Sequence, residues 1–327
     1  MLSKNQKRAI LFIIDILFSG FIWNVNASWG NPFLICLILS TTTFLIIFTP
    51  FEIYWSIRDL WFDRWENLAD DRFSVKREKI KVDDGFLSAN LVRLKSQNKN
   101  LSKEALIIIA HGFSDTKESL QYYYYPMALQ GYSILAYDAR GIGDSKKMGR
   151  RSQFLKRIED FKQIIQWVKN HEQFTDYEIF CVGFSIGALT VLCGGFSTRE
   201  ISKIIAISSM ADYKKSIEEA GFLVKFSYFI KGVNLSPEES RNKKLSPSLI
   251  FEDLKSSLEE LEFKKLASRV MLVHTRNARI IKFENFAKNK EVLNLGEENQ
   301  LVMKKGGHSQ KKNEMALVGA SLKFFQS

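Results

Sequence analysis

From residue 106 onward, short runs of consecutive apolar residues alternate with longer stretches of helical periodicity. Uninterrupted apolar runs are typical of central strands that are covered on both faces. Strands that alternate with helices predict an α/β fold with a mostly parallel sheet and helices on both faces, and catalytic groups then gather at the carboxyl ends of the strands. The predicted strands are residues 106–110, 132–137, 179–182, 201–208, 270–274 and 300–304, with helices at about 117–130 and 153–170.

Two longer apolar runs precede this alternation, and they predict helices at 9–29 and 32–50. Each has about the length that spans a bilayer once its flanking aromatic residues are counted. Asp15 interrupts the first run, and because a carboxylate is costly in lipid we expect it to face the partner helix or lie near a surface. The aromatic and charged stretch from Phe51 to Trp65 predicts an interfacial helix. Residues 1–66 are therefore predicted to form a membrane-anchoring hairpin.

The charges around these two runs predict how the hairpin is oriented. Basic residues precede the first run and follow the second, whereas residues 24–31 between them carry no charge. The positive-inside rule then places both ends, and the domain that follows, on the cytoplasmic side. A cleaved signal peptide would leave that side unchanged, and a first segment lying flat on the membrane would reverse it. The basic residues are Lys4, Lys7, Arg8, Arg58 and Arg64.

Residues 183–187 (Gly-Phe-Ser-Ile-Gly) carry the strongest chemical signal in the chain. They stand between a predicted buried strand and a predicted buried helix, which is the setting of a nucleophile elbow. The glycines allow strand and helix to approach, and the strained turn lifts Ser185 above the sheet at a helix N-terminus. In isolation, the same pattern would also fit a helix start made of small residues.

Four segments together make the chain resemble the α/β-hydrolase superfamily, and within it the serine-aminopeptidase-like and monoglyceride-lipase-like esterases. They occur in the order of that family, and the resemblance extends from about Phe73 to the C-terminus. The segments are His111-Gly112-Phe113, Tyr137 to Ser145 (YDARGIGDS), Gly183 to Gly187, and Gly307-His308-Ser309.

The resemblance implies a role for each matching residue. Ser185 is the expected nucleophile, His308 the general base, and the backbone N–H groups of Phe113 and Ile186 the oxyanion hole. An imidazole activates a hydroxyl that is otherwise too weak a nucleophile, and each fixed N–H donor stabilises the oxyanion by about 2.7–4 kcal/mol. Taken alone, His308 also fits a solvated loop histidine. His111 is expected to shape the oxyanion loop, and Asp138 and Arg140 to fix the next loop.

The acid of a catalytic triad is missing from its usual position. The family pattern places an aspartate where this chain has Ala278. Asp212, which follows the strand at 201–208, is our tentative acid, although it also fits the cap of a helix. Asn277 is an uncharged alternative that could orient His308. The remaining interpretations are an unsupported Ser–His pair and a lapsed site that only binds.

Residues 211–267 interrupt the alternation of strands and helices, and predict a cap over the site. Residues 221–230 are strongly aromatic, and residues 245–262 have leucines at helical spacing. An apolar cap would favour an acyl chain, while the alternative is that these are ordinary core helices. Tyr122–Tyr125 predict either a pocket wall or a helix packed on the sheet.

Composition narrows the partners of the protein. The net charge is +11, and the pI is near 9.4. No nucleic-acid-binding motif accompanies this charge, so an anionic membrane surface is the expected partner. The three cysteines and four histidines lack metal-ligand spacing, and no dinucleotide or P-loop motif occurs. We therefore expect no metal, no cofactor and no nucleic acid.

These observations predict a membrane-anchored serine hydrolase with an anchor at 1–66 and an α/β-hydrolase domain at 67–327. The expected reaction is cleavage of a lipid or other acyl ester through an acyl-enzyme. One alternative is an inactive binding or scaffold protein with the same fold. Another is a thioesterase, peptidase or acyltransferase built on the same elbow.

Overall fold

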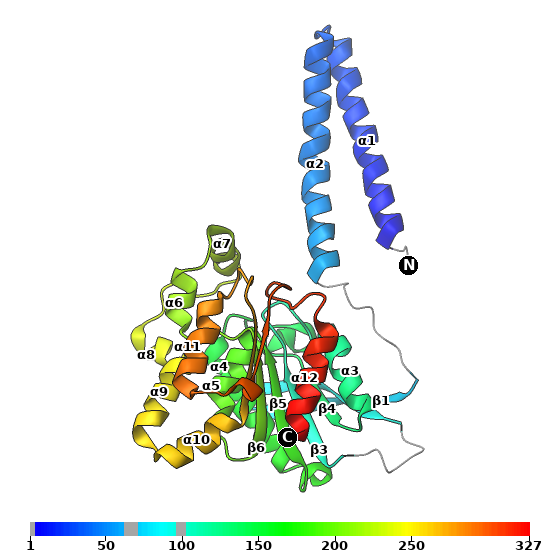
Figure 1. Ribbon diagram of the computed structural model, residues 1–327. Helices are drawn as coiled ribbons and strands as arrows, with labels where there is room; N and C mark the ends of the chain where they lie inside the picture. Colours follow the sequence, from blue (N-terminus) through cyan, green and yellow to red (C-terminus); the bar gives the residue numbers. More distant parts are fainter. Residues whose placement is uncertain (1–3, 62–70, 96–102) are drawn as a thin grey trace. The chain divides into compact units, whose positions relative to one another are not determined.

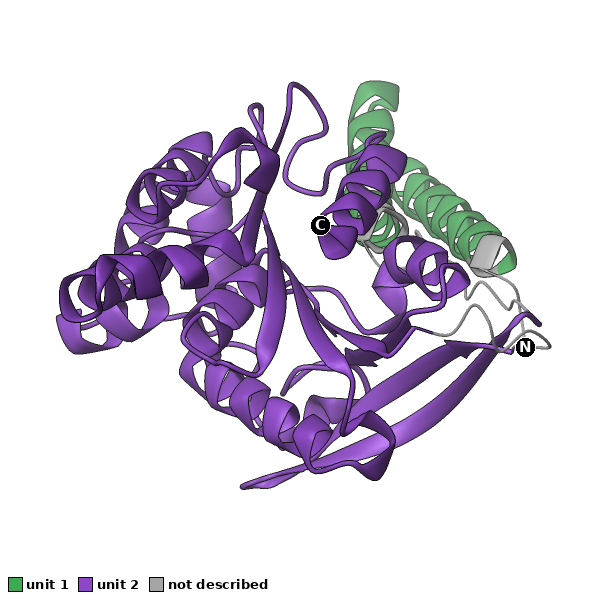
Figure 2. Cartoon of the chain, turned by 60° about the horizontal axis from the view of Figure 1, so that its bottom comes forward, with its two compact units in different colours: residues 1–66 green, residues 67–327 purple. Residues whose placement is uncertain are grey.

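The computed structural model describes residues 4–61, 71–95 and 103–327. The chain forms two compact units, Met1–Glu66 and Asn67–Ser327 (Figure 2). Each unit is described separately below.

The first unit is a pair of long apolar helices, α1 (Lys4–Ser28) and α2 (Phe33–Trp61). Within them, Arg8–Ser28 and Phe33–Trp55 have the length and hydropathy of membrane spans, a test that signal sequences also pass. Asp15 is 3% exposed and, with Phe48 of α2, lines a small pocket of this unit. Arg8 forms an ion pair with Glu52 between the two helices. The predicted hairpin is therefore present as a helix pair with an acidic residue turned inward.

The second helix is longer than the sequence predicted. It continues through Pro50 to Trp61, so in the described residues the stretch from Phe51 is not a separate interfacial helix. Residues 62–65 of that prediction lie outside the described residues. A proline removes one backbone donor from a helix, yet here the helix continues on both sides of Pro50.

The second unit is built on one eight-stranded sheet with the order β1-β2-β4-β3-β5-β6-β7-β8 (Figure 1). The pairs β1–β2 and β2–β4 are antiparallel, and the remaining pairs are parallel. The predicted mostly parallel sheet is confirmed, and every strand predicted from an apolar run is present within two residues at each end. The strands are β1 (Phe73–Val82), β2 (Gly85–Leu94), β3 (Ala105–Ala110), β4 (Ser133–Tyr137), β5 (Glu178–Phe184), β6 (Ile201–Ile207), β7 (Val270–Thr275) and β8 (Gln300–Met303).

Helices cover both faces of this sheet. On one face, α3 (Gln121–Leu129) and α12 (Glu314–Gln326) enclose an apolar core with the odd-numbered side chains of β3. Tyr123 and Tyr124 are fully buried there, which settles the open question about 122–125 in favour of a helix packed on the sheet. The other face is covered by α4 (Phe154–Lys169), α5 (Ile186–Gly195), α9 (Pro247–Ser257), α10 (Glu260–Ser268) and α11 (Phe283–Leu293).

The cap is smaller than the predicted insertion at 211–267. The amphipathic stretch 245–262 is divided between α9 and α10, because the chain is extended at Leu258 and Glu259. Phe251 and Phe263 from these helices are buried in the main core beneath the sheet, so α9 and α10 belong to the body of the domain. The elements left for a cap are α6 (Tyr213–Glu218), α7 (Phe222–Ile230) and α8 (Glu239–Leu245).

Buried ion pairs fix the loops at the carboxyl ends of β3 and β4. The Lys117 ammonium donates to Asp138 at 2.6 Å and to Asp144 at 2.8 Å, and Lys117 and Asp138 are almost completely buried. Arg140 makes a bidentate contact with Asp160 of α4. The expected role of Asp138 and Arg140 in holding this loop is consistent with these contacts.

Candidate active site

Ser185 stands at a sharp turn between β5 and α5. Its backbone has φ 54° and ψ −114°, a conformation that residues other than glycine rarely adopt. A methyl group at Gly183 would overlap the carbonyl of Gly187, and one at Gly187 would overlap the carbonyl of Ala110. Both glycines are therefore required by the close approach of strand and helix, as the pattern at 183–187 predicted.

The Ser185 hydroxyl and the His308 ring meet across 123 positions of the chain. The distance between Ser185 Oγ and His308 Nε2 is 2.9 Å, which is a hydrogen bond. Both side chains are half-buried rather than sealed in the interior. The geometry is that of a nucleophile with its general base, and a solvated loop histidine would not make this contact.

The other ring nitrogen of His308, Nδ1, has no hydrogen-bond partner in the part of the chain that the structure describes. When Ser185 donates to Nε2, the proton of the neutral imidazole lies on Nδ1. Nδ1 is buried, and no acceptor reaches it from the described residues. Burial, with a smaller contribution from nearby His274, lowers the pKa of His308 to about 4. The ring is therefore neutral at pH 7, and nothing near Nδ1 supports an imidazolium.

Asp212 does not supply the missing support. Its carboxylate accepts a hydrogen bond of 2.9 Å from the backbone N–H of Lys215 and caps α6. The hydrogen bond to His308 that a triad acid would make is not formed, so the placement of Asp212 as a partner of His308 is corrected here. The physical reason is local, because an aspartate at a helix N-terminus satisfies backbone donors of its own helix.

Asn277 and Ala278 both stand in the turn after β7. The Asn277 side chain accepts a hydrogen bond of 2.9 Å from the backbone N–H of Gly307, so it contacts the loop of His308 but not the imidazole. Ala278 is buried at 7% exposure, in the place where the family pattern has its aspartate. An uncharged methyl group at this position is consistent with the unpartnered Nδ1.

The predicted oxyanion loop follows β3 and lies beside Ser185. A methyl group at Gly112 would stand 3.6 Å from Ser185 Cβ and 2.5 Å from a carboxylate oxygen of Asp115. The His111 ring is buried, contacts the Gly112 carbonyl through Nδ1 and accepts from the Ala139 backbone through Nε2. Burial is the main cause that lowers the pKa of His111 to about 3. These contacts fit a neutral structural residue that shapes the loop.

Two residues that the sequence did not single out hold the histidine loop. Ser208, at the end of β6, has φ 53° and accepts a hydrogen bond of 2.6 Å from the Gln310 side chain. Its hydroxyl also donates to the His308 carbonyl at 3.4 Å. The only sequence signal was the place of Ser208 at a strand end, because its partners are 100 or more positions away.

An aromatic cluster connects the oxyanion loop with the cap elements. The Phe113 ring packs edge-on against Phe154 and Tyr228, with centroids 5.5 and 5.8 Å away. Phe154 in turn packs against Tyr213 of α6. These rings belong to a third apolar cluster that also contains Ile186, the second predicted oxyanion residue. The surroundings of Ser185 are therefore apolar on the cap side.

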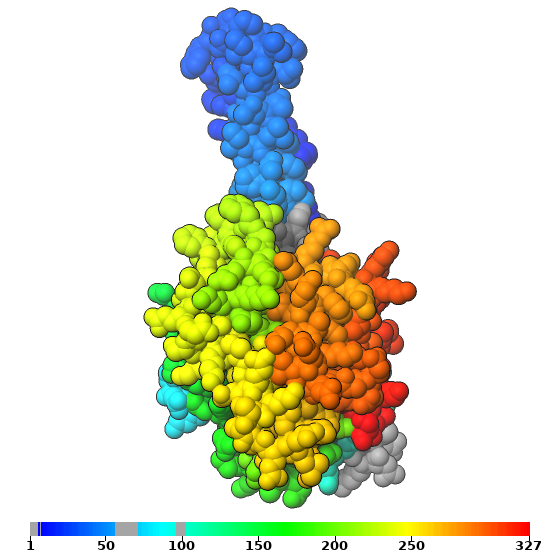
Figure 3. Space-filling model, turned by 60° about the vertical axis from the view of Figure 1, so that its left-hand side comes forward, coloured from blue at the N-terminus to red at the C-terminus, as the bar shows by residue number. Residues whose placement is uncertain are grey.

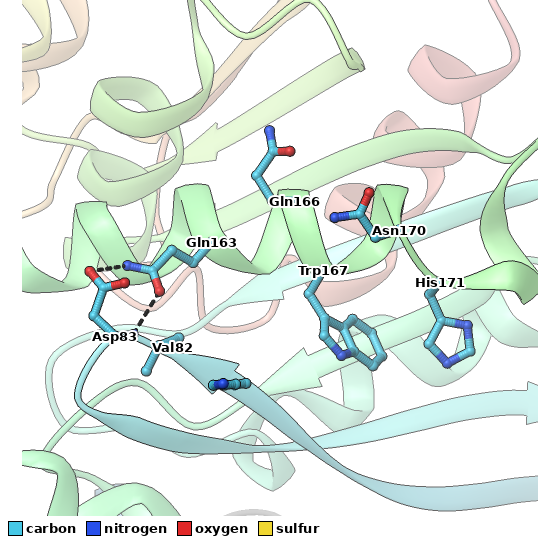
Figure 4. Close-up of a pocket in the computed structure, with 8 residues that line it drawn as sticks. Val82, Asp83, Gln163, Gln166, Trp167, Asn170 and His171 are labelled. Carbon is cyan, nitrogen blue, oxygen red and sulfur yellow. Dashed lines mark hydrogen bonds between the residues drawn. The ribbon is translucent and has the colours of Figure 1, made fainter.

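A different pocket lies between β1 and α4 and contains none of the predicted catalytic residues (Figure 4). Its volume is about 400 Å³, and Trp167 and His171 form one end of it. At the other end the Gln163 side chain donates to the Asp83 carboxylate at 2.8 Å. Among the residues that the structure describes, no group of three or more His, Cys, Asp or Glu could hold a metal ion.

The chain is similar to known hydrolases in sequence pattern and in fold. A family model described as serine aminopeptidase, S33, matches residues 102–320. No curated protein matches the chain by sequence. The predicted resemblance and the predicted α/β-hydrolase fold are thus confirmed.

Solved structures show the same fold at low sequence identity. An acylaminoacyl peptidase from Pyrococcus horikoshii superposes with a TM-score of 0.56 at 16% identity, over 82% of this chain and 43% of the peptidase. The chain therefore spans less than half the length of that protein. An esterase from Pyrococcus furiosus superposes with a TM-score of 0.51 at 22% identity, over 78% of this chain and 91% of the esterase. A dienelactone hydrolase from Anabaena variabilis superposes with a TM-score of 0.52 at 12% identity, over 78% of this chain and 98% of the hydrolase.

Proposed function

This chain belongs to the serine aminopeptidase S33 family of α/β-hydrolases, and from that premise we propose that it is a membrane-anchored serine hydrolase that cleaves an ester. The observation that carries the proposal is the 2.9 Å hydrogen bond between Ser185 Oγ and His308 Nε2 at a strained elbow. The substrate class follows from the apolar cluster around the site and from the two apolar N-terminal helices, which favour a lipid or acyl ester.

In the proposed reaction, Ser185 attacks the acyl carbonyl while His308 Nε2 takes the hydroxyl proton. The backbone N–H groups of Phe113 and Ile186 stabilise the tetrahedral oxyanion. His308 then gives the proton to the leaving alcohol, and an acyl-Ser185 remains. Water, deprotonated by the same imidazole, attacks that acyl group, and the acid is released with Ser185 regenerated.

The unpartnered Nδ1 of His308 predicts that this enzyme is slow. In a serine protease, replacing the triad aspartate by asparagine lowers kcat by about 10⁴. An enzyme that lacks this partner keeps the catalysis due to the oxyanion hole and to substrate binding. If the rate were lower still, the site would bind its ligand without cleaving it. A test of the proposed function must therefore be able to detect slow turnover.

Labelling of Ser185 by a fluorophosphonate probe tests the proposal directly. We expect the folded wild-type protein to form one covalent adduct, located at Ser185 by peptide mass spectrometry. Heat-denatured wild type and the variants Ser185→Ala and His308→Ala are expected to lose the label. Folded protein that stays unlabelled at Ser185 under prolonged exposure would favour the binding protein instead.

A peptidase is the second candidate, and the family description and the peptidase neighbours favour it. Parallel assays with p-nitrophenyl acyl esters and aminoacyl p-nitroanilides separate the two activities. For an esterase we expect kcat/KM to rise with acyl length and the anilides to remain uncleaved. Faster cleavage of the anilides would assign a peptidase to the same Ser185.

A further inference from the structure

Helix α7 exposes an unusual number of large apolar side chains. Phe222, Leu223 and Phe229 are 79%, 77% and 69% exposed, and none of the nine residues of the helix is buried. The exposed apolar residues recur at helical spacing and lie on one side of α7. We call this side the outer face of α7: Phe222, Leu223, Phe226, Phe229 and Ile230.

The opposite side of α7 contacts the predicted oxyanion loop. The Tyr228 ring packs edge-on against Phe113, and the Lys231 ammonium lies 5.2 Å from the centroid of the same ring. Lys231 also reaches the Ser114 hydroxyl at 3.4 Å. Figure 1 shows α7 at one extremity of the second unit, and Figure 3 shows the same yellow-green region at its surface. The helix thus has an exposed apolar face on one side and contacts the predicted oxyanion loop on the other.

The charge around α7 suits an anionic partner. Residues 213–245 contain seven lysines and arginines against four glutamates. Lys225 on α7 itself donates to the Glu218 carbonyl, and Lys231 follows the last turn. An apolar helical face with basic residues beside it is the pattern of a helix that lies in the boundary between lipid headgroups and acyl chains.

A bilayer fits this face better than a folded protein partner or a second copy of the chain. The same chain carries two helices of 21 and 23 residues with the hydropathy of membrane spans. In the proposed function these helices anchor the chain, which would put a membrane within reach of the domain. At nine residues, α7 is about 13 Å long, too short to span a bilayer but long enough to lie along its surface. Isolated apolar faces of this extent on soluble surfaces mark contact sites.

We propose that the outer face of α7 docks into the headgroup region of an anionic bilayer, and that the docked helix presents the site to lipid substrate. This proposal rests on the proposed function for the identity of the substrate, but the docking itself needs no hydrolysis. Because α7 contacts Phe113 directly, docking would place the predicted oxyanion loop next to the membrane surface.

A fluorescent label at position 226 tests the docking without any assay of activity. Full-length Phe226→Cys and Leu261→Cys are labelled with an environment-sensitive dye and reconstituted in phosphatidylglycerol-containing vesicles, with unlabelled lipids or bromolipids. Leu261 on α10 is the matched control because it is also a large exposed apolar residue, at 64% exposure against 52% for Phe226. Unsubstituted protein treated with the dye measures the background from Cys36, Cys181 and Cys193.

We expect a blue shift and strong bromolipid quenching at position 226 and neither effect at position 261. Equal quenching at the two positions would overturn the proposal. The proposal would also be overturned if the dye at position 226 quenched itself increasingly with protein concentration and did not respond to bromolipid. That result would mean that a second copy of the chain covers the outer face of α7.

The steady-state kinetics of Phe226→Asp are a second, independent test of the docking. We expect KM for an ester embedded in anionic vesicles to rise at least fivefold, with kcat/KM for a short soluble ester within twofold of wild type. The control Leu261→Asp should change neither value. A loss of both activities to the same extent would indicate a structural role and contradict docking. If the wild type has no esterase activity, only the proposed function is contradicted. The quenching experiment would still test whether α7 docks on the bilayer.

Discussion

His308 combines a hydrogen bond to Ser185 with a second ring nitrogen that has no partner among the described residues. A buried donor left without an acceptor costs about 1–3 kcal/mol, so such an atom usually marks a missing group. The buried Ala278 stands where the family pattern has a carboxylate. Position 278 is therefore where a carboxylate is expected to increase activity.

Substituting Ala278→Asp should raise kcat for ester hydrolysis by tenfold or more, because a carboxylate next to Nδ1 would hold the tautomer and stabilise imidazolium. Steady-state kinetics with a p-nitrophenyl ester measure the effect. Ala287→Asp, at an exposed alanine of α11, is the matched control and should leave kcat unchanged. A folded Ala278→Asp protein with unchanged kcat would show that position 278 does not face His308.

The pH dependence of the wild type should also reflect the missing acid. A general base must be unprotonated, and the pKa of His308 is lowered to about 4 by burial and by His274. The value of kcat/KM is therefore expected to stay level from pH 8 to about pH 5 and to fall only as pH approaches 4. In Ala278→Asp the same decline should move to higher pH, since a carboxylate favours the protonated ring. An acid limb near pH 6.5 in the wild type would contradict this assignment.

Local patterns predicted the parts of the site that depend on local geometry. Gly183 and Gly187 could be interpreted from the sequence because strand, turn and helix are contiguous there. The roles of Asn277, Ser208 and Gln310 could not, because each contacts a residue at least 30 positions away. Asp212 fitted two interpretations equally well, and only the hydrogen bond to the Lys215 backbone distinguishes them.

At the scale of elements, the elbow depends on how closely α5 approaches β3. Gly187 has no room for a side chain, whereas Gly319 of α12 has open space around it. Continuous apolar runs predicted the central strands well, because strands covered on both faces need no polar positions. Strands β1 and β2 were not predicted, because both mix exposed and buried residues. Strand β1 forms the edge of the sheet, and β2 lies next to it.

The two glycines predict opposite effects on stability. Gly187→Ala should destabilise the protein by about 3 kcal/mol or more, because the added methyl overlaps the Ala110 backbone, which cannot move without distorting the sheet. Gly319→Ala should stabilise it by about 0.5–1 kcal/mol through helix propensity. Melting temperatures in detergent compare the two variants. A Gly187→Ala protein as stable as wild type would mean that the elbow is looser than described.

The charges that flank the two apolar helices predict on which side of a membrane the second unit would work. The positive-inside rule, applied to the charges around α1 and α2, predicts the cytoplasmic side. Residues 24–31 should then face the opposite side.

Cysteine accessibility in intact bacterial cells tests this orientation. A membrane-impermeant maleimide should label Ser28→Cys, at the end of α1, in intact cells. It should label Met315→Cys, at an exposed position of α12, only after the cells are permeabilised. Labelling of Met315→Cys from outside would reverse the predicted topology, and removal of the protein by carbonate extraction would exclude integral anchoring.

The alanine at position 278 also has an evolutionary consequence. Two of the four alanine codons become aspartate codons by one base change, so from those codons a carboxylate at position 278 is a single mutation away. If Ala278→Asp accelerates hydrolysis as expected, the alanine itself sets the slow turnover of the wild type. Slow release of the acyl group would then lengthen the lifetime of the acyl-Ser185 form.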